Sequence, residues 1–177
     1  KEKYFDLIVS GLTLQWCNNL DAVFREVKYL LKTNGVFLFT SFGPDTLKEL
    51  RDCWSRIDDY IHVNTFVDMH DIGDALMRNG LTSPILNAEE IVLTYQECKQ
   101  LMRELKYIGA RNINSGRRKT LTGKKRIEKV FEYYETYRAN NKLPVTYEVI
   151  YGHAWQPVNK KNEQSIKLDD IKKQLTK

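Results

Sequence analysis

Cysteine, histidine and proline are scarce in this 177-residue sequence, and no long hydrophobic run occurs in it. The three cysteines, Cys17, Cys53 and Cys98, are odd in number and form no C-x-x-C pair, so neither a disulfide framework nor a zinc site is predicted. His70 and His153 have no Cys, Asp or Glu cluster at metal-ligand spacing. No apolar segment approaches the roughly 20 residues of a membrane span, and the charged start is unlike a signal peptide. We therefore expect a cytoplasmic protein with no metal and no membrane partner.

Positive charge, by contrast, is abundant and unevenly distributed. Residues 99–129 hold eleven Lys or Arg and two Glu, a local charge of +9, whereas the whole chain carries only +5. A segment of this density favours an acidic or polyanionic partner. A solvated surface that has no partner is the alternative interpretation.

The first forty residues have the pattern of a β-α-β unit. Residues 5–10, FDLIVS, are an apolar run typical of a buried parallel strand. Apolar residues at helical spacing predict a helix over 20–31, with Asn18 or Asn19 as its N-cap and Asn34-Gly35 as its stop. Residues 36–42, VFLFTSF, predict a second buried strand parallel to the first.

The rest of the chain alternates helices with two further strands. Asp68 is expected to cap a helix that buries Met77 and ends at Gly80, and Thr122 to cap a later one. The expected elements are a helix from Pro44 to Trp54, a helix over 68–80, a strand over 90–95, a helix over 101–109, a basic connector over 110–126, a helix from 122 to 134, and a strand over 145–157. Residues 158–177 are polar and predict a surface tail.

Several segments of the sequence resemble known enzyme families. The stretch DLIVSGLTLQWCNNLDAVFREVKYLLKTNGVFLFTSFGPDTLKELR resembles the second half of a class I S-adenosylmethionine-dependent methyltransferase. HVNTFVDMHDIGDALMRNGL, LMRELKYIGARNINSGRRKTLTGKKR and LPVTYEVIYGHAW resemble the malonyl-acyl-carrier-protein O-methyltransferases of biotin synthesis. The resemblance implies an α/β fold with part of a Rossmann-like sheet, its strands equivalent to 4-5-7-6, with flanking helices and an antiparallel last strand. Residues 1–157 would then be the C-terminal portion of a methyltransferase domain.

The resemblance also implies a reaction. The methyl group of S-adenosylmethionine, as cosubstrate, would pass to the free carboxylate of malonyl-acyl-carrier protein. This nucleophile is ionised at neutral pH, so no general base is expected and no catalytic residue is named. Catalysis would come from alignment and desolvation, without a metal.

One part of the family pattern is missing from the sequence. The Gly-rich turn and the acidic residues that hold the cofactor in complete members do not occur, and the nearest glycines, Gly11 and Gly35, form no G-x-G pattern. We therefore expect this chain to be inactive by itself. Without the strands that would flank it, the segment 5–10 becomes an apolar edge that can pair with another copy.

The resemblance suggests candidate site residues on the loops. Ser10 and Gly11 end the first strand, and together with Leu12 they are the expected cofactor contacts, although a plain strand-to-loop turn would have the same sequence. The expected substrate contacts are Gln15, Trp16, His62, Asn64, Arg111, Arg117, Arg118 and Tyr147. The arginines suit a carboxylate or a phosphopantetheine phosphate, and the basic segment 99–129 suits an acidic carrier protein. Core packing is the alternative for the aromatic residues, and solubility for the basic ones.

Two alternative functions remain open from the sequence. FGPDTLKELR also resembles the mitochondrial relative that hydroxylates an arginine during assembly of respiratory complex I. The basic segment could instead make the chain a non-enzymatic nucleic-acid-binding module, but it lacks the interleaved aromatic residues of a single-strand platform, so no nucleic-acid partner is expected. The sequence does not separate a carrier-protein thioester from a coenzyme A thioester.

Overall fold

The computed structural model describes residues 4–110, 112, 114, 116–118 and 120–158. In chain order its elements are β1 (Phe5–Ser10), the short 3-10 helix η1 (Leu14–Trp16), α1 (Leu20–Leu30), β2 (Leu31–Phe42), α2 (Lys48–Ser55), α3 (Met69–Arg78), β3 (Thr82–Tyr95), α4 (Cys98–Tyr107), α5 (Lys124–Glu135) and β4 (Leu143–Trp155). The basic connector lies between α4 and α5. The predicted tail, apart from Val158, lies outside the described residues.

The four strands form one mixed sheet in the order β1-β2-β4-β3. β1 runs parallel to β2, with Val9 opposite Leu38, and β4 runs antiparallel to both of its neighbours. This is the order 4-5-7-6 with an antiparallel last strand, so the predicted α/β fold class and topology are confirmed.

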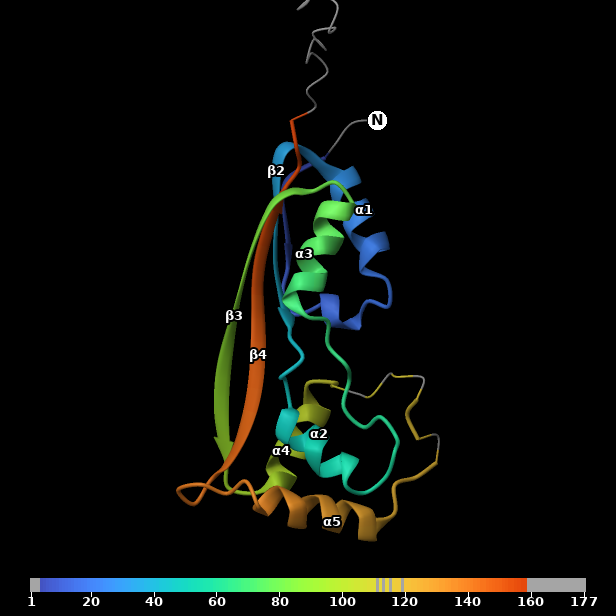
Figure 1. Ribbon diagram of the computed structural model, residues 1–177, viewed down its shortest axis with the longest axis vertical. Coiled ribbons are helices and arrows are strands. Elements are labelled where there is room, and N and C mark those ends of the chain that lie inside the picture. Colours follow the sequence, from blue (N-terminus) through green and yellow to red (C-terminus); the bar gives the residue numbers. More distant parts are fainter. Residues whose placement is uncertain (1–3, 111, 113, 115, 119, 159–177) are drawn as a thin grey trace, which may run out of the picture.

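The helices pack at two levels of this long sheet, as Figure 1 shows. α1 and α3 lie beside its upper part, where Phe24, Leu76 and Ile150 belong to one buried cluster. α2, α4 and α5 surround its lower part, where Leu101, Tyr134 and Leu143 belong to a second cluster. The ends of β3 and β4 reach both levels and therefore connect the two cores.

Several sequence signals at helix ends are confirmed. Asn19 caps α1, because its side chain accepts a hydrogen bond from the backbone N–H of Ala22, and Asp68 caps α3 by accepting one from His70. Gly80 follows α3 with a φ of 77°, a left-handed conformation that glycine adopts without strain.

Other expected boundaries were wrong. α2 begins at Lys48 rather than Pro44, because the preceding residues pair with β4: Gly43 N–H donates to Glu148 and Leu47 N–H to Thr146. α5 starts after Gly123, and no side chain caps it in place of Thr122. Met77 is exposed rather than buried.

The strands were underestimated in length. β3 begins at Thr82 and not at residue 90, and β2 begins at Leu31, directly after α1, instead of at Val36. In both cases pairing with a neighbouring strand fixes the conformation of residues whose own pattern is weak.

β1 is an edge strand, and several of its apolar side chains are exposed. Among the described strands only β2 pairs with it, and Leu7 and Val9 are 49% and 65% exposed, where the apolar run alone predicted burial. The edge and its apolar side chains are the feature on which the expectation of self-association rests.

Candidate functional site

The lower helices and the connector enclose a cavity of about 470 Å³. It lies between α2, α4, the loop after α2 and the connector, beside the ends of β2 and β4. Six of the eight expected substrate contacts line it, although they come from distant parts of the chain: Trp16, His62, Asn64, Arg117, Arg118 and Tyr147. The structure therefore brings together most of the residues that the resemblance suggested.

Aromatic rings form much of the cavity wall. Phe42, at the end of β2, lies 5.8 Å from the rings of both Phe66 and Tyr147. The imidazole of His62 stacks on the indole of Trp54, with 3.7 Å between ring centroids and 7° between ring planes. Such packed rings exclude water, and they strengthen any charge interaction made inside the cavity.

The polar part of the cavity wall is positively charged. Lys106, Arg117 and Arg118 line it together with His62, and no Asp or Glu is found among its lining residues in the described part of the chain. A site of this composition is complementary to an anionic ligand. It is also suited to a carboxylate, which a guanidinium can bind with two parallel hydrogen bonds.

Asp58 lies behind this wall and contacts its basic residues. Its Oδ1 is 2.6 Å from Nε2 of His62, and its Oδ2 is 3.9 Å from Nη1 of Arg118 and from Nε of Arg126. The side chain of Asp58 is 12% exposed. The guanidinium of Arg118 also lies over the ring of Tyr60, at 5.6 Å. Asp58 thus hydrogen-bonds to His62 and lies near Arg118 and Arg126, so its carboxylate compensates part of the positive charge beside the cavity.

Hydrogen bonds fasten the connector to the loop after α2. The side-chain amide of Asn112 donates to the carbonyl of Ile61, and Ile61 N–H donates to the carbonyl of Gly116. Nδ2 of Asn114 donates to Oδ1 of Asn64 at 2.8 Å. These bonds position Asn64 and the arginines that follow, although the two segments are about fifty residues apart in sequence.

A second cavity, of about 560 Å³, adjoins the first and shares Asn64, Phe66 and Arg117 with it. Gln15 is part of its wall, and Nε2 of Gln15 donates to the carbonyl of Leu12 at 2.6 Å. Gln15 is therefore the seventh expected substrate contact that the structure places in this region.

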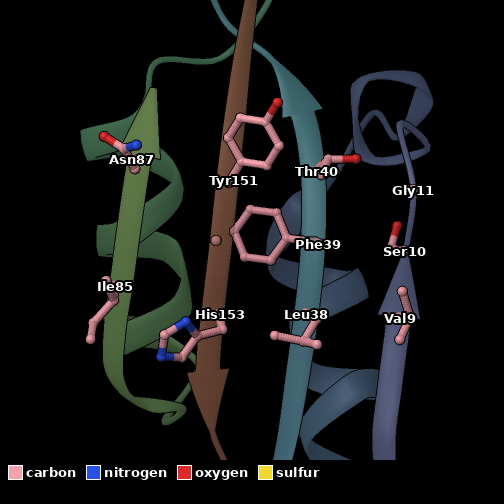
Figure 2. Close-up of a pocket in the computed structure, with 11 residues that line it drawn as sticks. Val9, Ser10, Gly11, Leu38, Phe39, Thr40, Ile85, Asn87, Tyr151 and His153 are labelled. Atoms are coloured by element: carbon pink, nitrogen blue, oxygen red, sulfur yellow. The ribbon is translucent and has the colours of Figure 1, made fainter. Parts of the chain in front are cut away.

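The expected cofactor contacts lie elsewhere on the sheet. Ser10 and Gly11 border a hollow of about 410 Å³ on the sheet face that α1 and α3 leave uncovered (Figure 2). There Val9, Leu38, His153 and Ile85 form one row across the four strands. Leu12 borders neither cavity, and its backbone N–H donates to Thr40. The three residues are not brought together with the basic cavity.

Sequence reasoning missed several residues of the basic cavity. Trp54 was expected only as part of a helix, Phe66 and Met102 were given no role, and Lys106 was only one of many cations in the basic segment. The one available signal was the Asn-x-Asn pattern at 112 and 114, which departs from a solvated basic loop. Arg111, also expected at the site, lies outside the described residues.

The tyrosines around the lower core make stability sensitive to alkaline pH. Burial, together with a hydrogen bond to Asp52, raises the pKa of Tyr137 from 10.0 to about 12, and burial also raises the pKa of Tyr95, Tyr134 and Tyr147. Because the folded state favours the neutral phenol, this stabilisation is complete below pH 10 and is lost as pH rises toward 12.

We expect the urea midpoint of unfolding to fall between about pH 10 and about pH 12. The replacement Tyr137→Phe should make that fall shallower, since it removes one of the groups that titrate. A midpoint that stays constant over this range would contradict the assignment of buried neutral tyrosines.

In the described part of the chain, no group of three or more His, Cys, Asp or Glu side chains is placed to hold a metal ion. No helix there is long and apolar enough to cross a membrane.

Comparisons with known proteins give the fold and the site a family context. A family model described as "Methyltransferase domain" matches residues 1–39. The malonyl-[acyl-carrier protein] O-methyltransferase of Nitrosospira multiformis is 52% identical over 151 residues, covering 85% of this chain and 49% of that protein. The protein of the same name from Laribacter hongkongensis is 47% identical, covering 93% and 54%. The chain thus spans about half the length of the curated relatives it matches.

Solved structures show the same architecture. A candidate methyltransferase from Bacillus halodurans matches with a TM-score of 0.57 at 12% identity, over 88% of this chain and 66% of that one. The YcgJ protein of Bacillus subtilis matches with a TM-score of 0.56 at 13% identity, over 88% and 65%. Similarity at this level of identity concerns the fold alone. The chain is thus similar in sequence to the malonyl-[acyl-carrier protein] O-methyltransferases over about half of their length, and the solved structures share its fold.

Proposed function

We propose that this chain carries the acceptor side of a methyltransferase that acts on the free carboxylate of malonyl-acyl-carrier protein in biotin synthesis. The observation that carries the proposal is the cavity lined by Lys106, Arg117, Arg118 and His62 with no carboxylate in its described wall. The names of the relatives supply the reaction. The chemistry of the cavity supplies an independent reason for an anionic acceptor.

The role of these residues in the reaction is to bind and orient the acceptor. S-adenosylmethionine, when bound, supplies a methyl group on a positively charged sulfur. A new bond forms between a malonyl carboxylate oxygen and the methyl carbon, while the carbon–sulfur bond breaks and leaves S-adenosylhomocysteine. The carboxylate is already ionised at neutral pH, so no residue has to remove a proton. Arg118 and Lys106 would hold the carboxylate, and the rings of Phe42 and Trp54 would exclude water from it.

The residues of this chain that are expected to contact the cosubstrate all lie at the end of β1. A side chain added at Gly11 would meet nothing within 4 Å, so the end of β1 offers space for a close approach. Ser10 and Leu12 would accompany Gly11 in this contact. Because the chain spans about half the length of its relatives, we expect methyl transfer to require residues that the 177 do not include.

The expected partner is an acidic carrier protein in the cytoplasm. The described cations of residues 99–129 lie on α4, the connector and α5, and Lys106, Arg117 and Arg118 among them line the basic cavity. Steering of an acidic partner toward this side would accelerate its association at low salt.

Self-association through the exposed edge of β1 is a separate proposal. Its unpaired edge and apolar side chains are a template for pairing with a second copy. Sedimentation at tens of micromolar is the test. A clean monomer at that concentration would contradict it.

Carboxylate recognition can be tested on the chain as it is. Calorimetric titration with malonyl-coenzyme A and with acetyl-coenzyme A compares two ligands that share the arm and differ in the free carboxylate. We expect malonyl-coenzyme A to bind at least tenfold more tightly, since it gains charge-assisted hydrogen bonds. Equal affinities would overturn the assignment of the cavity.

Methyl transfer itself is tested with labelled S-adenosylmethionine and malonyl-acyl-carrier protein. We expect no transfer by the 177-residue chain. We expect transfer to malonyl-acyl-carrier protein by a chimaera in which the N-terminal half of the Nitrosospira multiformis relative precedes the chain. Transfer by the chain alone would show that the N-terminal half of the relatives is not required. A folded chimaera that binds the cosubstrate but leaves malonyl-acyl-carrier protein unmethylated would overturn the proposed reaction.

A further inference from the structure

The most exposed large apolar side chains of the described chain lie at the two ends of the connector. Tyr107 is 87% exposed, Ile108 is 74% exposed and Leu121 is 95% exposed. Tyr107 ends α4, and Leu121 precedes α5 by a few residues. Scattered exposed apolar residues need no explanation, but three such side chains around one cavity mark a candidate interaction surface.

These residues flank the rim of the basic cavity. Ile108 lines the cavity from one side and Thr122, which adjoins Leu121, lines it from another. Tyr107 and Leu121 are not part of its wall, so a small ligand inside the cavity would not need them. A ligand that covers them must therefore extend over the rim.

Positive charge predominates around these apolar residues, although Glu104 on α4 and Glu128 on α5 are also exposed and Glu128 pairs with Lys124. Lys106 is exposed beside Tyr107 and lines the cavity, Arg103 is exposed one turn earlier on α4, and Lys124 and Lys125 are exposed at the start of α5. The surface, which we call the apolar–basic rim, consists of Tyr107, Ile108 and Leu121 with these four cations. Its complement is an acidic surface with an apolar spot.

We propose that the apolar–basic rim is the docking surface of an acidic carrier protein, which places its acyl group in the cavity through a flexible arm. The identity of the carrier as acyl carrier protein rests on the proposed function. The geometry favours a protein over a free thioester, because Tyr107 and Leu121 lie outside the cavity and only a large ligand can cover them. It favours a carrier over other acidic proteins, because a cavity for a small anion opens within the same rim.

The test uses an apo-acyl carrier protein, which has no arm and no acyl group. Fluorescence anisotropy measures its binding to the 177-residue chain at low salt. We expect Ile108→Ser and Leu121→Ser to weaken binding about fivefold to tenfold each, and Tyr107→Ser by a similar factor. The matched control is Met77→Ser on α3, also an exposed apolar residue, which should leave binding unchanged. Thermal unfolding of each variant establishes that all are folded.

The outcomes separate this proposal from the proposed reaction. Failure of apo-carrier protein to bind, or equal binding by the rim variants and Met77→Ser, would overturn the docking surface. Rim-dependent binding to vesicles of anionic lipid in place of the carrier protein would overturn the choice of partner, as would rim-dependent association of the chain with itself. Equal affinities for malonyl- and acetyl-coenzyme A would instead overturn the proposed acceptor, whatever the apo-carrier protein does.

Discussion

Replacing Tyr134 by alanine is expected to lower the free energy of unfolding by about 3–5 kcal/mol, the range for loss of a large buried ring. Tyr134 lies on α5 and is fully buried in the lower core, and its hydroxyl donates to the carbonyl of Pro144 at 3.0 Å. The residue therefore joins α5 to the beginning of β4. Its removal would leave a cavity and also a carbonyl without its partner.

Two further variants separate these contributions. Tyr134→Phe keeps the ring and removes only the hydrogen bond, which should cost about 1 kcal/mol. Tyr107→Ala removes an aromatic ring of the same kind from an 87% exposed position and should change stability by less than about 0.5 kcal/mol. Urea unfolding at neutral pH gives all three values. If Tyr134→Ala costs no more than Tyr134→Phe, the ring does not contribute to the core as its burial indicates.

The fold was predictable where local patterns and family resemblance agreed. The helical stripe of α1, its Asn19 cap and the Gly80 stop of α3 are local signals, and all are present in the structure. The strand order came from the resemblance, since no periodicity places the last strand between β2 and β3. Boundaries failed where distant pairing decides them, as at Gly43, which hydrogen-bonds to Glu148 across more than a hundred residues.

The site was predictable in its parts but not in its arrangement. His62, Asn64 and Arg118 were expected at the substrate from their phrases, and the structure places all three around one cavity. The role of Asp58 could not be foreseen, because its contacts with His62 and Arg126 join residues that are four and sixty-eight positions away. Exposure at Tyr107 and Leu121 was equally invisible, since an apolar residue in a sequence reads first as core.

Removing the guanidinium of Arg118 should have the largest effect on ligand binding. We expect Arg118→Ala to weaken malonyl-coenzyme A binding by about 10- to 100-fold, the equivalent of one or two charge-assisted hydrogen bonds. Two effects act in the same direction. The cavity loses a cation, and Asp58 loses one of the charges that compensate its carboxylate. Calorimetric titration with malonyl- and acetyl-coenzyme A measures the change.

Arg126 provides the matched control for this variant. Its Nε lies at the same 3.9 Å from Oδ2 of Asp58, but Arg126 does not line the cavity. Arg126→Ala therefore removes a similar charge from Asp58 and leaves the cavity wall intact, so it should weaken malonyl-coenzyme A binding only a few-fold. Acetyl-coenzyme A binding should hardly change in either variant. If Arg118→Ala weakens both ligands equally, Arg118 contacts the arm that they share, and the malonyl carboxylate must be held by Lys106 or Arg117.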